Sequence, residues 1–392
     1  HDRVLGTRPP WYSSPVPHDE ITRAVLAREE VVRYLQGSED ESPLQAQERV
    51  YSYLEELRTT QRYRMYRALQ HPLYPLLRKI DLQAAHVSIA QTATRQGRVI
   101  YASNHKSHID YLVQPLLLDN NGIRPPVIAA GINLFGGALG LIHKHVTGAI
   151  PIRREMKDPA YLATLKAYVA EILQRHDLFL YLEGGRSYSG ELKRFKTGLL
   201  HAAAQAQRTD VVVIPVAIAY DLVLEDFVLS RQRVKRQQRP FAREVAEMIR
   251  YAVGYHSRAI VSFGEPIRLS EYDPNARRSM VQLNRRLRDD IGRLYTVVPS
   301  ALMAAAMRPS IQRDELEDQI DRLIEILKAG GARLAVETGR EAVEAATEPF
   351  TIRKILVVEG DRYRVRERTV LRYYARTIEH LLKDRRRPAL TH

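Results

Sequence analysis

The sequence contains no cysteine. This absence excludes disulfides, thiolate metal sites and a cysteine nucleophile, and it is compatible with a reducing compartment. Long apolar segments are missing as well, since no stretch reaches the roughly 18–20 uncharged apolar residues of a membrane-spanning helix. The nearest candidate, residues 127–142, contains Asn133 and several glycines. We therefore expect that segment to be buried or to lie at a membrane surface.

Several motifs with known chemistry are also absent. In the segment GGRSYSG, residues 184–190, Ser189 stands where a serine-hydrolase G-x-S-x-G motif requires glycine. Glu191 follows where a phosphate-binding P-loop requires lysine. There is no H-E-x-x-H, and no G-x-G-x-x-G stands between a strand pattern and a helix pattern. We therefore expect neither a bound metal nor a cofactor.

Acidic residues are scarce relative to basic ones, with 46 Asp and Glu against 60 Lys and Arg and a net charge of +14. This excess favours polyanionic partners, namely nucleic acids, anionic lipid surfaces or phosphorylated small molecules. The most basic run, residues 230–250, carries no nucleic-acid-reading motif and is equally well explained as a solvated helix face. We therefore expect no nucleic-acid partner. Because the net charge alone would suit one, a basic nucleic-acid-binding protein is the alternative hypothesis from a different functional class.

Short, β-branched apolar runs dominate the middle of the chain, and helical patterns alternate with several of them. The runs lie at residues 98–103, 126–131, 148–154, 177–184, 211–220 and 259–267. This alternation predicts an α/β fold with a mostly parallel central sheet flanked by helices. Helical periodicity on either side predicts an N-terminal helical region at 1–84 and a C-terminal helical region at 276–392, around an α/β domain at 85–275.

The segment SNHKSHIDYL, residues 103–112, follows the first of these strands and admits two interpretations. In one, Ser107 caps a helix and Asp110 completes an S-x-x-D capping box. In the other, His105 lies at the carboxyl edge of the sheet, where α/β folds bind ligands, and Asp110 folds back onto it. A carboxylate on one imidazole nitrogen stabilises the charge that develops when the other nitrogen accepts a proton. The proton would come from a hydroxyl of the substrate.

Three more polar clusters follow predicted strands, and each is either a set of solvated loop charges or part of a ligand site. They contain Arg153 and Arg154, then Glu183 and Arg186, then Arg194 and Lys196. Together, several cations at one sheet edge suit a phosphate group, and a carboxylate such as Glu183 suits substrate hydroxyls.

Four segments in order, NHKSHID, GAIPIRR, YLEGGRS and VIPVAIAY, resemble the four sequence blocks of the glycerolipid acyltransferases. The double glycine of EGGRS, the following KTG and the C-terminal VLRYYARTIEHL resemble the bacterial membrane-bound glycerol-3-phosphate acyltransferases and their dihydroxyacetone-phosphate relatives. This resemblance implies that residues 85–275 form an acyltransferase domain. It implies transfer of a fatty acyl group from acyl-CoA or an acyl-carrier protein to a hydroxyl of glycerol 3-phosphate, giving lysophosphatidate in phospholipid synthesis.

The resemblance also implies roles for individual residues. His105 would be the general base, oriented by Asp110, and no acyl-enzyme would form. The substrate-binding positions that match the blocks are Arg153, Arg154, Glu183, Gly184, Gly185, Arg186, Ser187 and Lys196. Among them Arg153, Arg186 and Lys196 would hold the phosphate. The protein would act as a peripheral, monotopic enzyme on an anionic membrane surface, at the cytoplasmic face of the cell membrane.

Two positions depart from the family pattern. The third block commonly reads R-S-R, whereas Tyr188 follows Arg186 and Ser187 in this chain, and the second block usually has an aromatic residue where Pro151 stands. A tyrosine donates one hydrogen bond but carries no charge. The acceptor could therefore also be dihydroxyacetone phosphate or a lysophospholipid. A catalytically silent membrane scaffold with this fold is a further alternative.

Overall fold

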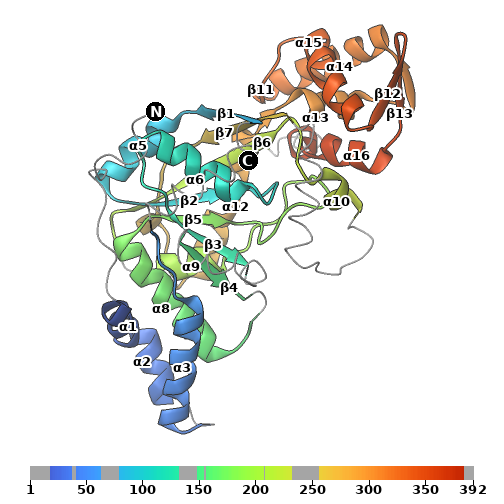
Figure 1. The fold of residues 1–392 in the computed structure, drawn as a ribbon. Helices are drawn as coiled ribbons and strands as arrows, with labels where there is room; N and C mark the ends of the chain where they lie inside the picture. The colour runs from blue at the N-terminus through green and yellow to red at the C-terminus, as the bar shows by residue number, and fades with distance from the viewer. Residues whose placement is uncertain are drawn as a thin grey trace, which may run out of the picture.

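The computed structural model describes residues 18–37, 41–62, 79–131, 148–153, 156–206, 208–231 and 256–383. A central sheet lies among flanking helices, the N-terminal helices extend from one end, and the C-terminal elements gather at the other (Figure 1). This is the α/β arrangement that the alternating strand and helix patterns predicted.

The central sheet has eight strands within the described residues, in the order β1–β7–β6–β2–β5–β3–β4, with β8 paired to β6. The pairs β6–β7 and β6–β8 are antiparallel and the other neighbours are parallel. The strands are β1 Ile80–Ala85, β2 Arg98–Ser103, β3 Val127–Gly131, β4 Ala149–Ile152, β5 Leu178–Tyr181, β6 Val211–Tyr220, β7 Ser257–Phe263 and β8 Ile267–Arg268. Strands β2 and β6 are buried at nearly every residue, as expected for a sheet covered on both faces.

The strand register brings the predicted sequence blocks to one edge of this sheet. Ser103, the last residue of β2, pairs with Tyr181, the last residue of β5, and with Val216 of β6. At the end of β4, Ile152 pairs with Gly131 of β3. Because these five strands run parallel, the segments that follow β2, β4 and β5 all leave the sheet at its carboxyl edge.

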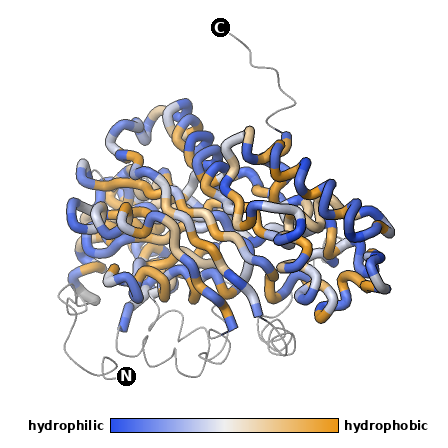
Figure 2. Tube along the Cα trace, turned by 90° about the horizontal axis from the view of Figure 1, so that it is seen from above, coloured by the Kyte–Doolittle hydropathy of each residue, from blue (hydrophilic) through white to orange (hydrophobic). Residues whose placement is uncertain are grey.

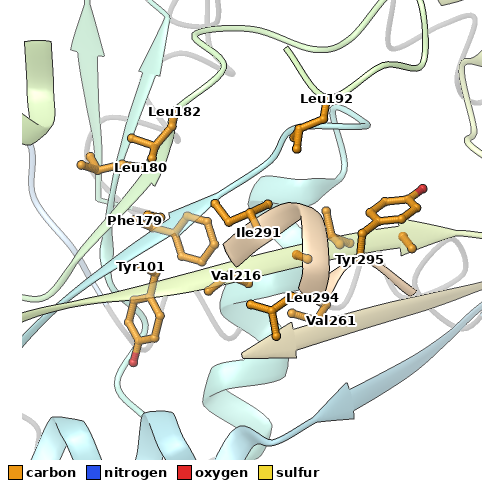
Figure 3. Packing of buried hydrophobic residues seen from close by; sticks show 14 of the residues in the cluster. Tyr101, Phe179, Leu180, Leu182, Leu192, Val216, Val261, Ile291, Leu294 and Tyr295 are labelled. Atoms are coloured by element: carbon orange, nitrogen blue, oxygen red, sulfur yellow. The ribbon is translucent and has the colours of Figure 1, made fainter. Parts of the chain in front are cut away.

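The helices that accompany the sheet are α5 Val87–Gln96, α6 Asp110–Asn120, α8 Pro159–Arg175, α9 Gly198–Ala204, α10 Asp226–Arg231 and α12 Arg277–Leu294. In the core, the ring of Tyr101 stacks on that of Phe179 at 5.7 Å between centroids and meets Phe263 edge-on at 6.4 Å. Figure 3 shows Ile291 and Leu294 of α12 in the same cluster as these β-strand side chains. Each such buried side chain contributes roughly 1.5–3 kcal/mol to folding.

The N-terminal helices α1 (His18–Leu26), α2 (Glu29–Gly37) and α3 (Pro43–Leu57) pack against α8. Helix α3 begins with a capping box, because the Ser42 side chain accepts from the N–H of Gln45 while the Gln45 side chain accepts from the N–H of Ser42. An ion pair of 2.7 Å between Arg28 Nε and Glu171 Oε1 joins the α1–α2 turn to α8. These contacts attach the N-terminal helices to the sheet domain.

The C-terminal elements form a smaller unit that contains strands as well as helices. Its helices are α13 Pro299–Ala306, α14 Arg313–Ala329, α15 Gly339–Ile352, α16 Arg368–Arg376 and α17 Glu379–Lys383. Strands β10 (Ser310–Gln312), β12 (Leu356–Glu359) and β13 (Arg362–Val365) form an antiparallel sheet, and β9 (Thr296–Val297) pairs with β11 (Arg333–Leu334). The sequence pattern predicted helices alone here, because strands of two to four residues are too short to show alternation.

Hydropathy follows this architecture. In Figure 2 the central strands are the most hydrophobic segments, and hydrophobic and hydrophilic residues alternate along the outer helices. Every helix in the described part of the chain falls short of the length and apolarity that crossing a bilayer requires. Of the segments at 127–142 and 230–250 that could meet a membrane, only residues 127–131 and 230–231 are described, and the remainder lies outside the described residues.

Candidate active site

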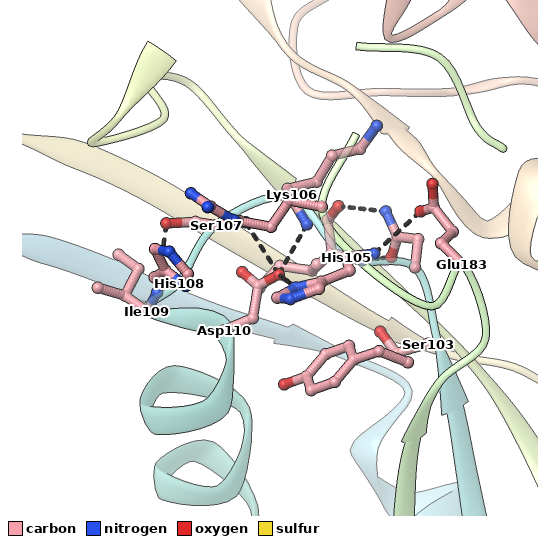
Figure 4. A network of polar contacts seen from close by, with 12 residues as sticks. Ser103, His105, Lys106, Ser107, His108, Ile109, Asp110 and Glu183 are labelled. Atoms are coloured by element: carbon pink, nitrogen blue, oxygen red, sulfur yellow. Dashed lines mark hydrogen bonds and ion pairs between the residues drawn. The ribbon is translucent and has the colours of Figure 1, made fainter. Parts of the chain in front are cut away.

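His105 and Asp110 lie at the carboxyl edge of the sheet and face each other (Figure 4). His105 comes two residues after the end of β2, and its Nδ1 lies 2.8 Å from Oδ2 of Asp110. Asp110 is fully buried, whereas 15% of the His105 side chain is exposed. Because Nδ1 is occupied by the carboxylate, Nε2 is the ring nitrogen left to meet a substrate. The histidine–aspartate pair predicted from the sequence is therefore formed.

Asp110 receives hydrogen bonds from four donors. Its Oδ2 accepts from His105 Nδ1, from the N–H of Lys106 at 2.7 Å and from the N–H of Ser107 at 3.0 Å. Its Oδ1 accepts from the hydroxyl of Tyr220, at the end of β6, at 2.7 Å. A carboxylate only accepts hydrogen bonds, so it matches a shell made of donors alone. This shell orients Asp110 toward the imidazole.

The predicted capping box at this helix is only half present. Asp110 does reach the N–H of Ser107, but the hydroxyl of Ser107 donates to Oε2 of the buried Glu225 at 2.6 Å. Helix α6 begins at Asp110, and Ile109 occupies the N-cap position. The interpretation of Ser107 as the N-cap is therefore wrong, because its hydroxyl oxygen accepts from the N–H of Ile109 at 3.3 Å, in the turn before the helix, and not from the first turn of α6.

Tyr181 fixes the plane of the His105 ring. The two rings stack with centroids 4.3 Å apart and planes inclined by 26°. The hydroxyl of Tyr181 donates to Oε1 of Gln114 at 3.0 Å, and Nε2 of Gln114 donates to Oγ of Ser103 at 2.9 Å. Burial raises the pKa of Tyr181 well above its usual value, so the phenol keeps its proton for this chain of hydrogen bonds.

Glu183 holds the main chain of the loop that carries His105. Its Oε1 accepts from the N–H of His105 at 3.0 Å and its Oε2 accepts from the N–H of Lys193 at 3.1 Å. The side chain is 4% exposed and does not line the pocket described below. The contact between Glu183 and a glycerol hydroxyl stays a prediction, whereas the observed contacts set the position of the His105 backbone.

A pocket of about 320 Å³ opens beside His105. The polar part of its lining includes His105, His108, Tyr111, Arg153, Tyr161, Tyr181, Gly184, Gly185, Arg186, Tyr188 and Lys196. The apolar part includes Ile128, Ala129, Ile152, Met156, Leu162, Leu165, Leu180, Leu182 and Leu199. Convergent cations beside an apolar wall suit a molecule with an anionic head and a hydrocarbon tail.

Arg186, from the third block, and Lys196, from the KTG segment that follows it, are predicted cations that line this pocket. Arg186 is only 7% exposed, and its Nη1 donates to Oε1 of Glu225 at 3.2 Å. Lys196 is exposed, and its stem crosses Gly184 so closely that an added Cβ would lie 2.7 Å from Lys196 Cδ. Gly184 also has a φ of +64°, a left-handed conformation that glycine adopts without strain.

Arg153 lines the pocket, but its charge already has a partner. Its Nε donates to Oε1 of Glu56, on α3, at 2.6 Å, and its Nη2 donates to the second oxygen of the same carboxylate. This carboxylate raises the pKa of Arg153. A phosphate at Arg153 would compete with Glu56, so the phosphate role of Arg153 stays a prediction. Arg154 lies outside the described residues.

The remaining predicted positions divide between the pocket and the loop interior. Gly185 lines the pocket, whereas Ser187 is fully buried and its hydroxyl donates to the carbonyl of Glu191 at 2.7 Å. Tyr188, which replaces the usual arginine, is 39% exposed and lines the pocket. The Arg186 guanidinium lies 6.0 Å and the Lys193 ammonium 5.3 Å from the centroid of its ring. Ser187 thus supports the loop, and Tyr188 contributes to the lining.

Lys106 joins this site to the C-terminal unit. It is buried, its Nζ donates to the carbonyl of Gly190 at 2.7 Å, and it lies 5.4 Å from the centroid of the Tyr295 ring. Burial lowers the pKa of Lys106. Gly190 in turn contacts the main chain of Tyr373, on α16. The residue after His105 is therefore anchored to elements far along the chain.

Replacing Gly190 by alanine should destabilise the protein by about 2–6 kcal/mol. The φ of Gly190 is +85°, and an added Cβ would lie 2.0 Å from the carbonyl oxygen of Tyr373, so both the backbone and the contact oppose a side chain. Urea unfolding of the Gly190→Ala variant measures this cost. The matched variant Gly198→Ala, where nothing lies within 4 Å of the added Cβ, should unfold close to the wild type. Equal stabilities would contradict the close contact.

Several residues of this site were missed by the sequence reasoning. Tyr181 and Tyr220 end apolar strands and were given no role in the site, although Tyr181 stacks on His105 and Tyr220 binds Asp110. Glu225 and Glu56 come from segments without any motif. For the two tyrosines, their position at the carboxyl ends of strands next to the His105 strand was an available signal.

The sequence is similar to an acyltransferase family model and to several bacterial enzymes. Residues 84–219 match the acyltransferase family model. The glycerol-3-phosphate acyltransferase of Pseudomonas syringae pv. syringae is 30% identical over 315 residues, covering 72% of this chain and 37% of that protein. The enzyme of Pseudomonas syringae pv. tomato is 33% identical over 236 residues, covering 58% of this chain and 28% of that protein. For the Aeromonas hydrophila enzyme the identity is 27% over 377 residues, 86% of this chain and 46% of that protein.

The chain thus spans less than half the length of these curated relatives. Among solved structures, the 1-acyl-sn-glycerophosphate acyltransferase of Thermotoga maritima aligns with a TM-score of 0.32 and 12% identity, over 70% of this chain and 84% of that one. The order of the four blocks predicted the sequence relationship correctly. Residues 84–219 are similar to the acyltransferase family, and the chain is similar in sequence to bacterial glycerol-3-phosphate acyltransferases.

Proposed function

We propose that the chain transfers a fatty acyl group from acyl-CoA or an acyl-carrier protein to a hydroxyl of glycerol 3-phosphate, giving lysophosphatidate. The observation that carries this proposal is the His105–Asp110 pair, 2.8 Å apart, on a pocket that also presents Arg186 and an apolar wall. The names of the curated relatives support the acceptor. The cations suit its phosphate, and the apolar wall suits an acyl chain.

The proposed mechanism uses the imidazole as a general base. Nε2 of His105 takes the proton of the acceptor hydroxyl as its oxygen attacks the thioester carbonyl, and Asp110 stabilises the imidazolium through Nδ1. The tetrahedral oxyanion then collapses, the C–S bond breaks, and the thiolate leaves with the proton from Nε2. Ester and free thiol form in equal amounts, and the enzyme regains its starting protonation state without an acyl-enzyme.

Because of Tyr188, two other phosphate-bearing molecules are alternative acceptors. Where family members commonly carry a second arginine, this pocket presents a neutral phenol beside Arg186 and Lys193. Dihydroxyacetone phosphate and a lysophospholipid each present a hydroxyl and a phosphate, so the same chemistry would serve them.

A matrix of donors and acceptors tests the proposed function. The purified chain is given palmitoyl-CoA or palmitoyl-acyl-carrier protein together with glycerol 3-phosphate, dihydroxyacetone phosphate or a lysophospholipid, and free thiol is followed with time. We expect the highest kcat/KM with glycerol 3-phosphate. A higher value with another acceptor would assign that acceptor instead, and thiol release with none of them would contradict acyl transfer.

Replacing Tyr188 by arginine should lower KM for glycerol 3-phosphate about two- to fivefold, the equivalent of the roughly 0.5–1 kcal/mol of a partly exposed ion pair. The new guanidinium would stand beside Arg186 and Lys193, and a phosphate dianion relieves the repulsion among the three cations. Initial rates at varied acceptor concentration measure the change. Tyr188→Phe, which keeps the ring and adds no charge, is the control. An unchanged KM in Tyr188→Arg would place the phosphate elsewhere.

A further inference from the structure

Glu225 is a buried carboxylate between β6 and α10 that joins two loops of the candidate site. It is 3% exposed and does not line the pocket. Its Oε2 accepts from the Ser107 hydroxyl at 2.6 Å, and its Oε1 accepts from the N–H of His108 at 2.6 Å and from Nη1 of Arg186 at 3.2 Å. The first two contacts reach the loop of the His105–Asp110 pair, and the third reaches the glycine-rich loop. One side chain therefore connects the proposed base to the proposed phosphate-binding cation.

We propose that Glu225 is a positioning residue that fixes the Arg186 guanidinium for the phosphate of the acceptor; this rests on the proposed function. Arg186 is itself only 7% exposed, so water does little to satisfy its charge. A buried arginine without a carboxylate partner carries a large desolvation cost and turns toward other acceptors. The pair with Glu225 compensates this charge and fixes Nη1 of a guanidinium that lines the pocket.

The segment that carries Glu225 is held by the C-terminal unit. Arg353 Nη2 donates to the carbonyls of Val223 at 3.3 Å and Leu224 at 3.1 Å, and it also binds the carboxylate of Asp226. The Tyr374 hydroxyl donates to Oδ2 of Asp226 at 2.6 Å and accepts from the N–H of Val223 at 3.0 Å. The residues on both sides of Glu225 are therefore fixed by α16 and by the residue that follows α15. Through them the C-terminal unit sets the position of Arg186.

The variant Glu225→Gln isolates this role. Its amide can still accept from the His108 N–H and donate to the Ser107 oxygen, but it removes the negative charge that faces Arg186. We expect KM for glycerol 3-phosphate to rise about 10- to 100-fold, because the contact with Arg186 loses its charge assistance, with kcat changed less than threefold. A fall in melting temperature with KM unchanged would overturn the proposal.

A matched control is Glu171→Gln. Glu171 is also a buried carboxylate bound by two arginines, Arg28 at 2.7 Å and Arg175 at 2.9 Å, but it holds the N-terminal helices to α8. This variant should lose stability and keep the wild-type KM. If Glu225→Gln fails to fold, Tyr374→Phe replaces it, because the ring stays while the hydroxyl contacts to Val223 and Asp226 are lost. Its KM should rise severalfold, and a wild-type KM would contradict the role of the C-terminal unit.

A double-mutant cycle decides whether Glu225 acts through Arg186. In the Arg186→Ala background, Glu225→Gln should change KM less than twofold, because the cation it positions is gone. The double variant should also melt at a higher temperature than Arg186→Ala, since it no longer buries an uncompensated carboxylate. Independent, multiplying effects on KM would show that Glu225 acts elsewhere and would overturn the proposal.

Inorganic phosphate separates failure of this proposal from failure of the proposed function. Phosphate should raise the melting temperature of the wild type, and Glu225→Gln should need at least tenfold more phosphate for the same rise. This readout needs no acyl transfer. If the wild type transfers no acyl group but the two proteins still differ in phosphate protection, the proposed function is wrong and the proposal for Glu225 stands. Equal protection of both proteins, or no protection of the wild type, would overturn the proposal for Glu225.

Discussion

Replacing His105 by alanine should lower kcat for acyl transfer about 10²–10⁴-fold, the range for loss of a general base. The imidazole is held by Asp110 on one side and by the Tyr181 ring on its face, so its Nε2 has one geometry available for the acceptor hydroxyl. Without it, the hydroxyl must attack while still protonated. The change should appear in kcat, measured as thiol release at saturating acceptor, with KM for glycerol 3-phosphate little altered.

The control for this variant is His256→Ala. His256 is exposed and lies at the start of β7, away from the pocket lining, so its removal should leave kcat at the wild-type value. Equal rates for His105→Ala and the wild type would contradict general-base catalysis by this residue, whatever the substrate.

Replacing Asp110 by asparagine should lower kcat by up to about 10⁴-fold, the loss seen when the aspartate of a serine triad is changed in this way. The side-chain amide of asparagine has one oxygen and one NH2 group. Its NH2 group would replace one carboxylate oxygen and would face donors, because all four groups around the carboxylate donate hydrogen bonds. It can no longer stabilise the imidazolium. The mismatch should also lower the free energy of unfolding by about 1–3 kcal/mol.

Measuring kcat and urea unfolding on the same variant separates the two interpretations of this residue. A loss of stability with normal kcat would mean that Asp110 only organises the start of α6. Asp119→Asn changes a buried aspartate at the other end of the same helix and should keep the wild-type kcat.

The sheet was predictable because its strands are short, continuous apolar runs. Residues 98–103 and 211–220 are strands β2 and β6 with the predicted bounds, and the runs that became β3, β4 and β5 were placed to within a few residues. Strands buried on both faces show no alternation, so the run itself is the signal. Parallel order then put His105 at the carboxyl edge, where a pair with Asp110 was one of two interpretations of the local spacing, and the order of the four blocks favoured it.

The partners of the charged residues were not predictable in the same way. Arg153 binds Glu56, 97 residues earlier, and Ser107 binds Glu225, 118 residues later. Such contacts depend on how α3 and the segment after β6 fold against the sheet edge, and no local pattern encodes them. For this reason Ser107 was taken as a helix cap and Arg153 as an open cation, whereas in the structure each is bound by a carboxylate from a distant segment.

The stoichiometry of the reaction tests the central claim most directly. The wild-type chain is incubated with palmitoyl-CoA or palmitoyl-acyl-carrier protein, with and without glycerol 3-phosphate, and free thiol and lysophosphatidate are quantified in the same sample. Direct transfer by His105 predicts one lysophosphatidate for each thiol and no thiol release above background without the acceptor. Thiol release at the same rate without glycerol 3-phosphate, or an acylated protein detected by mass spectrometry, would contradict it.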